Sequence, residues 1–282
     1  MMARRWRIAM VALFAVTGLA AGGLAGRAGA EELAVPGSGN PEYVLERLAE
    51  AFNAAQRGHQ VTVPPSIGTA GALRDIASGA ATLARVGRPL KEAERANGVV
   101  FVPIGRDPVV FAAGAGVTVR SITSDQVLAI YRGTVTDWQQ LGGTSVPIRP
   151  IGREVTDASR SAMSGYIKPF ADIAFAENVK LVHLDFQEIE LLDRFASSFG
   201  FLNRSALSAC KTKVVILALD GIEPSTENVS AGKYPVSLDF GLIYLPGKLT
   251  PAGEAFLAFI RSSAGTRILQ DHGVIAASQK TG

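Results

Sequence analysis

The chain of 282 residues contains a single cysteine, Cys210, and only three histidines. One cysteine cannot form an intrachain disulfide, so the fold must be stabilised by packing. His59, His183 and His272 lie far apart in the sequence and lack the spacing of metal ligands. We therefore expect no metal site and no cofactor.

Signatures of catalysis are missing as well. The sequence has no Gly-x-Ser-x-Gly elbow, no Walker phosphate loop and no pair of carboxylates that stands out for acid–base work. We expect a protein that is not an enzyme and has no catalytic residue. An exported hydrolase, whose catalytic groups meet only in space, stays open as an alternative.

The first 30 residues have the pattern of a signal peptide. Arg4, Arg5 and Arg7 precede an apolar run from residue 8 to about residue 24, and small residues at 28–30 follow. We expect cleavage before Glu31, export to the periplasm and no direct membrane anchor afterwards. The alternative is a transmembrane anchor, because the run approaches spanning length.

Cleavage changes the charge of the chain. The leader holds four of the 28 basic residues and no acidic one, so the remainder has 24 basic and 25 acidic residues. A net charge of −1 gives no bulk positive field, which argues against nucleic acid as a partner.

Strand-like apolar runs alternate with helical patterns, which predicts an α/β protein. No internal repeat interrupts the alternation. Helices are expected over residues 40–56, from 69, 123–131, from 159 and 252–270, and strands over 61–63, 99–103, 109–113, 146–151 and 238–245.

Three short polar turns run directly into these helices, at residues 37–40, 68–71 and 157–159, and Arg153 lies just before the third. The start of a helix has unpaired N–H groups and the positive end of the helix dipole. Glycine lets a ligand approach the backbone closely, and arginine matches a tetrahedral anion. If the three starts converge, they form a site for a small oxyanion.

Longer motifs make the chain similar to a known family. Residues 122–133 are followed by Trp138 and by the Leu-Gly-Gly run at 141–143, and the tail at 256–267 has a matching pattern. This arrangement resembles the substrate-binding proteins of bacterial phosphate ABC transporters, which are type II periplasmic binding proteins. The resemblance extends over essentially the whole chain after residue 30.

The resemblance implies two α/β lobes joined by crossing strands, with the ligand in the cleft between them. Lobe one is expected at residues 31–111 and 241–282, and lobe two at 112–240. The crossings are expected near residues 109–113 and 240–245. The implied partners are phosphate or a similar oxyanion and an inner-membrane ABC permease, and the protein is expected to be a monomer.

The family's ligand contacts transfer to this chain one by one, with some changes. In the second turn, Thr69 replaces a serine of the family and keeps its hydroxyl, whereas Ala70 has none. The aspartate of the family falls on Gly87. Arg85 and Arg88 flank Gly87 and belong either to the cleft or to the solvated surface. The expected ligand-binding residues are Ser38, Gly39, Asn40, Thr69, Ala70, Arg88, Arg153, Asp157, Ala158 and Ser159.

These departures leave the ligand open between phosphate and another oxyanion. Asp157 either accepts a hydrogen bond from protonated phosphate or caps a helix, or it repels anions and pairs with Arg153, Arg88 or Arg160. Ser38, Asn40 and Thr69 can each cap a helix instead of binding a ligand. A diverged family member that acts as a sensor or scaffold is therefore the second hypothesis.

Overall fold

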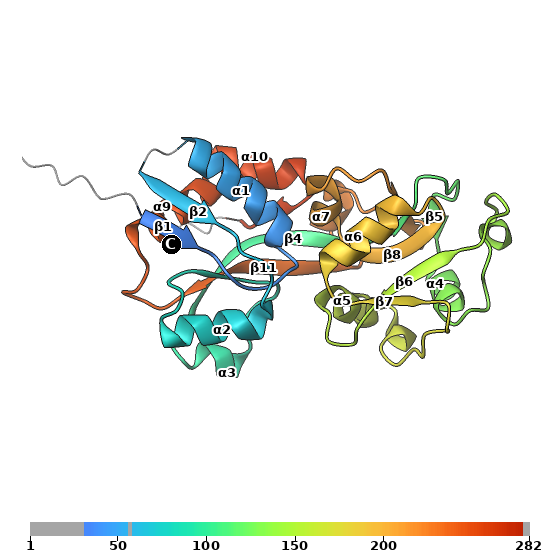
Figure 1. Ribbon diagram of the computed structural model, residues 1–282, viewed down its shortest axis with the longest axis horizontal. Coiled ribbons are helices and arrows are strands. Elements are labelled where there is room, and N and C mark those ends of the chain that lie inside the picture. The colour runs from blue at the N-terminus through green and yellow to red at the C-terminus, as the bar shows by residue number, and fades with distance from the viewer. Residues whose placement is uncertain (1–30, 56–57, 279–282) are drawn as a thin grey trace, which may run out of the picture.

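A computed structural model describes residues 31–55 and 58–278 of the protein. The expected signal peptide, residues 1–30, lies outside these ranges. Two groups of helices and strands lie side by side, and the long strands β4 (Val100–Ala113) and β11 (Ser237–Tyr244) run from one to the other (Figure 1). We call these groups lobe one, which contains the first helix, and lobe two.

The bounds of the remaining elements follow. The strands are β1 Glu31–Ala34, β2 His59–Thr62, β3 Ala84–Val86, β5 Ser121–Ile122, β6 Arg149–Arg153, β7 Lys180–Val182, β8 Ser198–Asn203, β9 Val215–Ile216, β10 Ala218–Leu219 and β12 Ile275–Ala276. The α-helices are α1 Glu42–Ala55, α2 Gly68–Ser78, α3 Glu92–Arg95, α4 Ser124–Tyr131, α5 Ala158–Tyr166, α6 Asp185–Arg194, α7 Arg204–Ala209, α8 Thr226–Ser230, α9 Pro251–Arg261 and α10 Ser263–Asp271. Two 3₁₀ helices span Trp138–Leu141 and Lys168–Phe170.

The main sheet has the strand order β3-β11-β4-β8-β6-β7. Strand β4 changes partner along its length: it pairs with β11 up to Pro108 and with β8 from Val109 onward. The apolar stretch 109–113 is fully buried, as expected for a strand in the middle of a sheet. The sheet therefore continues through the junction between the lobes.

Residues 99–103 and 109–113 were expected as separate strands, but all of them except Val99 belong to the single strand β4. The charged residues Arg106 and Asp107 lie between the two apolar runs and separate them in the sequence. Arg106 pairs with Asp239 on β11, and Asp107 accepts hydrogen bonds from Ser205 and Asn203. Because partners on β11, β8 and α7 satisfy these polar groups, the strand does not need to end.

The structure confirms only some of the helix caps that the sequence predicts. Thr123 caps α4 by accepting a hydrogen bond from the Gln126 N–H at 3.2 Å, as expected. Thr69 was also expected to cap a helix, and this was wrong. Ile67 occupies the cap position of α2 without a side-chain hydrogen bond, and Thr69 lies inside the first turn.

Each lobe has its own apolar core. In lobe one, α1, α9 and α10 cover one side of β4 and β11, while α2 and α3 lie on the other (Figure 1). In lobe two, stacked aromatic rings fill the centre, with Phe111 and Phe199 5.4 Å apart. The two cores place the turns that precede α1, α5 and α6 near the middle of the molecule, between the lobes (Figure 1).

Candidate functional site

The lobe-one side of the site is a set of three turns that bind one another through their backbones. The Ser38 N–H donates to the Arg85 carbonyl at 3.1 Å, and the Ile67 N–H donates to the Gly37 carbonyl at 2.9 Å. The turn at 37–40, the start of α2 and the end of β3 therefore lie together. This part of the expected convergence depends on hydrogen bonds between residues far apart in the sequence.

Arg85 holds these turns in place. Its guanidinium is fully buried and donates to the carbonyls of Ser38 at 2.8 Å and Pro64 at 2.7 Å, and it pairs with Glu42 at 2.7 Å. Burial lowers the pKa of Arg85, and Glu42 opposes this shift. Arg85 is thus neither a solvated surface residue nor a free cation in the cleft, and its role is structural.

Gly87, where the resemblance places the family's aspartate, is packed against the first turn. A Cβ at this position would lie 2.6 Å from Ser38 Oγ and 3.3 Å from Asn40 Cβ. A side chain at 87 would therefore displace Ser38. The absence of a side chain at 87 permits the close approach of these two polar residues.

Asn40 is the most unusual polar residue of this lobe. It is only 6% exposed, and both amide atoms, Nδ2 and Oδ1, are enclosed without a hydrogen-bond partner. Its side chain does not cap α1, and its carbonyl accepts a hydrogen bond from Asn203 Nδ2 at 2.8 Å. Enclosed polar atoms without a partner are costly, so this amide is a candidate for ligand contact.

The lobe-two side of the site is built around Arg153, the last residue of β6. Arg153 is 4% exposed and contacts three carboxylates: Asp157 at 2.8 Å, Asp185 at 2.5 Å and Glu188 at 3.2 Å. Its Nε atom is enclosed without a partner. Four ionisable groups thus meet at one buried position, and three of them are acidic.

Burial raises the pKa values of two carboxyl groups in this cluster. It raises the pKa of Glu188 to about 8 although Arg153 opposes the shift, and it raises the pKa of Asp157 for the same reason. Burial alone lowers the pKa of Arg153, but the carboxylates of Asp185, Asp157 and Glu188 outweigh it, so this pKa lies above its usual value. Near neutral pH, Glu188 therefore holds a proton for most of the time, which reduces the negative charge around Arg153.

Asp157 connects Arg153 to the start of α5. It is the N-cap, because its carboxylate accepts a hydrogen bond from the Arg160 N–H at 2.9 Å. Among the three arginine partners left open by the sequence, Arg153 is the one whose guanidinium pairs with the Asp157 carboxylate. Ser159 is buried in the first turn behind it, and Ala158 is the first helical residue.

The two sides of the site meet through Asp185, the first residue of α6. One carboxylate oxygen contacts Arg153, and a Cβ placed on Gly39 would lie 3.0 Å from the other. Ser66 lies beside the same glycine, at 3.3 Å from that Cβ position. The turn 37–40 of lobe one and Arg153 of lobe two are therefore brought together across one carboxylate.

Three of the expected residues lie at the margin of this arrangement. Arg88 donates to both carboxylate oxygens of Glu94 at 2.8 Å, so its charge is already paired. Thr69 is half-buried and Ala70 is exposed on α2. The structure brings together Ser38, Gly39, Asn40, Arg153, Asp157, Ala158 and Ser159.

Sequence reasoning missed four residues of the cluster: Ser66, Asp185, Glu188 and Asn203. Asp185 and Glu188 are acidic residues in the first turn of a helix, which is a common pattern with an ordinary explanation. Ser66 is one of many polar loop residues. No local signal distinguished them, because only the fold places them beside Arg153 or the turn at 37–40.

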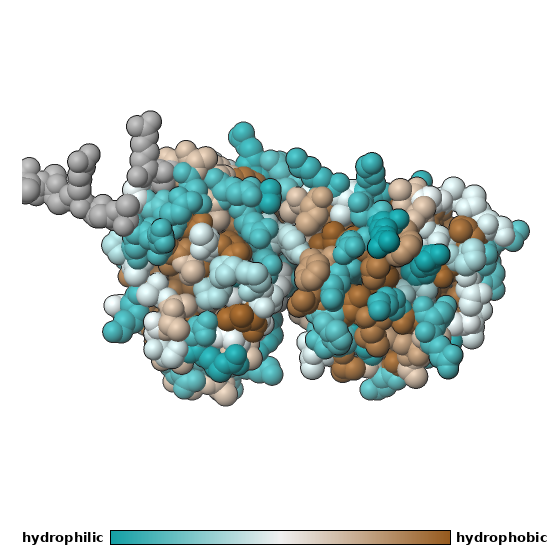
Figure 2. Space-filling model, viewed as in Figure 1, coloured by the Kyte–Doolittle hydropathy of each residue, from teal (hydrophilic) through white to brown (hydrophobic). Residues whose placement is uncertain are grey.

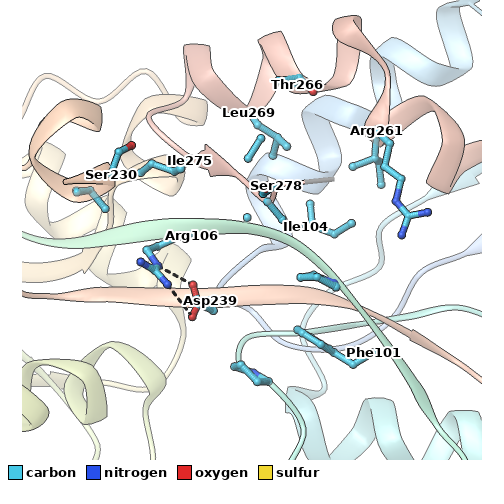
Figure 3. A pocket seen from close by; sticks show the side chains of 17 residues that line it. Phe101, Ile104, Arg106, Ser230, Asp239, Arg261, Thr266, Leu269, Ile275 and Ser278 are labelled. Carbon is cyan, nitrogen blue, oxygen red and sulfur yellow. Dashed lines mark hydrogen bonds and ion pairs between the residues drawn. The ribbon is translucent and has the colours of Figure 1, made fainter. Parts of the chain in front are cut away.

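A cavity of about 850 Å³ lies elsewhere, against β4, β11 and α10 (Figure 3). None of the ten expected residues lines it. Its wall is largely apolar, and the Arg106–Asp239 ion pair, with Nε and Oδ1 2.8 Å apart, lies at its edge. The enclosed unpartnered polar atoms of the described residues also lie outside its wall.

The surface is indented between the two lobes (Figure 2). Within residues 31–55 and 58–278, no group of three or more His, Cys, Asp or Glu side chains is placed to hold a metal ion. No helix of the described part of the chain is long and apolar enough to cross a membrane.

Comparison with known proteins identifies the family. A model described as a PBP superfamily domain matches residues 24–264. The chain belongs to the PBP superfamily. Its fold is that of the type II periplasmic binding proteins, so both the fold class and the resemblance inferred from the sequence are confirmed.

Relatives within the superfamily are named for phosphate. The phosphate-binding protein PstS of Borreliella burgdorferi is 20% identical over 252 residues, covering 86% of this chain and 89% of that protein. PstS of Bacillus subtilis is 26% identical over 164 residues, covering 56% of this chain and 51% of that protein. A Clostridium perfringens structure, described as a phosphate ABC transporter substrate-binding protein with bound phosphate, has a TM-score of 0.73 at 25% identity and covers 88% of this chain and 100% of its own.

Proposed function

We propose that this PBP-superfamily protein is an exported, non-enzymatic binding protein for inorganic phosphate or a related small oxyanion. The ligand is held between the lobes, and the protein delivers it to an ABC permease of the inner membrane. The relatives named for phosphate support this reading, since they match most of the chain. Residues 1–30, with the sequence pattern of a signal peptide, support export to the periplasm.

The observation that carries the proposal is the enclosed amide of Asn40. Its Nδ2 and Oδ1 have no partner, and Arg153 Nε, across the site, also has none. An oxyanion bearing a hydroxyl offers both an acceptor for the amide N–H and a donor for the amide oxygen. Asn40 lies beside Gly87, where the aspartate of the family is missing. Its amide oxygen is therefore available to a protonated ligand in that region.

The backbone contributes the remaining donors. The turn at 37–40 precedes α1 and Asp157 caps α5, and the positive ends of these two helices support an anion site between the lobes. Ser38 and Ser159, which are buried at these two helix starts, are the side chains that we expect to add hydroxyl groups. Such a site binds an anion through many neutral donors and one arginine.

The carboxylates around Arg153 favour one second candidate. A guanidinium with three acidic partners has little positive charge to offer an anion. This arrangement suits a family member that keeps the cleft but acts as a sensor or scaffold without a transported ligand. Binding of oxyanions at micromolar concentration separates the two candidates.

The test is calorimetric titration of the protein recovered after export and freed of bound ligand by unfolding and refolding. Phosphate is injected first, followed by sulfate, molybdate and a phosphonate. We expect Asn40→Ala to weaken oxyanion binding by about tenfold or more, because a hydrogen bond to a charged group is lost. The free energy of unfolding without ligand should not fall, since the amide has no partner there.

Asn97→Ala is the matched control, since Asn97 is exposed in the same lobe. It should leave the affinity unchanged. No heat with any of the four anions would contradict the transport-type function and favour the sensor or scaffold. Normal affinity in Asn40→Ala would remove Asn40 from the site.

A further inference from the structure

The guanidinium of Arg153 has no hydrogen-bonding position to spare at its outer nitrogens. Nη1 contacts Asp185 at 2.5 Å and Glu188 at 3.2 Å, while Nη2 contacts Asp157 at 2.8 Å and the His183 carbonyl at 3.4 Å. An oxyanion that binds these nitrogens must therefore replace a carboxylate. Adding a further anion beside the carboxylates of Asp157 and Asp185 would also be unfavourable.

Two of the three carboxylates are held by other bonds. Asp157 accepts a hydrogen bond from the Arg160 N–H at 2.9 Å as the cap of α5. Glu188 is fully buried and accepts from the Phe201 N–H at 2.9 Å. Among the described residues, Arg153 is the hydrogen-bond partner of the Asp185 carboxylate, and no backbone N–H holds it. Asp185 is thus the carboxylate that can leave most easily.

Asp185 also spans the space between the lobes. It belongs to α6 of lobe two, and its carboxylate lies close to the Gly39 turn, at the start of α1 in lobe one. The starts of α1 and α6 approach each other at the centre of the molecule (Figure 1). The side chain is only 12% exposed, and its charge is near enough to contribute to raising the pKa of Glu42, after the larger effect of burial.

We propose that Asp185 is an internal competitor of the oxyanion, which occupies the ligand's position on Arg153 and links the two lobes until the ligand displaces it. The statement that a ligand displaces Asp185 rests on the proposed function. We call this arrangement, in which Asp185 is bonded to Arg153 and lies beside the Gly39 turn, the latch. Asp185 then lowers the affinity of the site for every ligand, because each ligand must first displace the same carboxylate from Arg153.

The first test measures affinity. Asp185→Asn keeps the shape of the side chain and removes its charge, so we expect phosphate to bind about tenfold more tightly than to the unaltered protein. Glu190→Gln is the matched control, because Glu190 lies on the same helix with its side chain 65% exposed and loses one equal charge. It should change the affinity less than twofold. Weaker binding or no change in Asp185→Asn would overturn the competitor role.

The second test does not need a ligand. Small-angle X-ray scattering of the ligand-free proteins measures how far the lobes separate. We expect Asp185→Asn to have a larger radius of gyration than both the unaltered protein and Glu190→Gln, because the latch is broken. Equal radii would overturn the link between the lobes. If no variant binds an oxyanion, the proposed function fails, while the scattering result still decides whether Asp185 holds the lobes together.

Discussion

Glu188 shows how strongly the surroundings of one residue change its chemistry. It lies fully buried beside Arg153, and its ordinary pKa of 4.5 is raised to about 8 by burial. A Cβ on Gly200 would lie 2.7 Å from its Oε1, so the absence of a side chain at 200 makes room for the carboxyl group. The folded protein therefore binds a proton at Glu188 that the unfolded chain releases near pH 4.5.

We expect this proton to make stability fall as pH rises from about 4.5 to about 8. Over that range the folded state binds more protons than the unfolded state, so the free energy of unfolding decreases by up to about 1.4 kcal/mol per pH unit. Below and above the range, Glu188 contributes no slope. Glu188→Gln should remove this part of the slope.

Urea unfolding of the unaltered protein and Glu188→Gln at pH 5, 6, 7 and 8 measures the pH dependence of the free energy of unfolding. Burial raises the pKa of Asp107 to about 6, and that residue contributes equally to both proteins, so it cancels in the difference. The stability of Glu188→Gln relative to the unaltered protein should increase with pH. A difference independent of pH would mean that Glu188 is ionised in the folded state.

At the scale of elements, the end of β1, the start of α1 and β3 depend on Gly37. Its φ is 144°, and a Cβ there would lie 1.9 Å from the Arg85 carbonyl oxygen. The same carbonyl accepts the hydrogen bond from the Ser38 N–H. Only glycine allows the turn before α1 to approach β3 so closely, and this approach places Ser38 beside Gly87.

Gly37→Ala should lower the free energy of unfolding by about 3 kcal/mol, because both backbone strain and a steric clash oppose the native turn. Chemical unfolding measures this loss. Gly58→Ala is the matched control in the same lobe, since a Cβ at Gly58 meets no atom within 4 Å. Equal stability of the two variants would contradict the structural role of Gly37.

At the scale of the whole molecule, the lobes are also joined beside the crossing strands. Asn203, at the end of β8, donates to the Asn40 carbonyl at 2.8 Å, to Asp107 at 3.0 Å and to Ser205 at 3.0 Å. Asp107 lies on β4, close to where that strand changes partner. A single buried amide thus links lobe one, lobe two and the strand between them.

Asn203→Ala should lower the free energy of unfolding by about 1–3 kcal/mol, because Asp107 and the Asn40 carbonyl lose a buried donor. Asn228→Ala removes a solvent-exposed hydrogen bond, from Nδ2 to the Glu223 carbonyl at 3.0 Å, within lobe two, and should cost less. Denaturant unfolding of both variants compares the two losses. A larger loss in Asn228→Ala would contradict the linking role of Asn203.

Local patterns in the sequence determined much of this protein. The alternation of strands and helices, the cap at Thr123 and the glycine turn before α1 follow from interactions between residues a few positions apart, and so could be predicted. The boundaries expected between the lobes and the ligand contacts stay predictions. Arg153 was recognisable because a motif surrounds it.

Only the tertiary structure decided which groups surround that arginine. Asp185 and Glu188 are more than 30 positions away in the sequence and reach Arg153 because α6 packs beside β6. Arg85 was expected either in the cleft or on the solvated surface, yet it is buried and donates to three carbonyls of two other segments, at residues 35, 38 and 64. Charges are paired by long-range packing, which leaves no periodic or local trace in the sequence, so the electrostatics of the site could not be read before the fold was known.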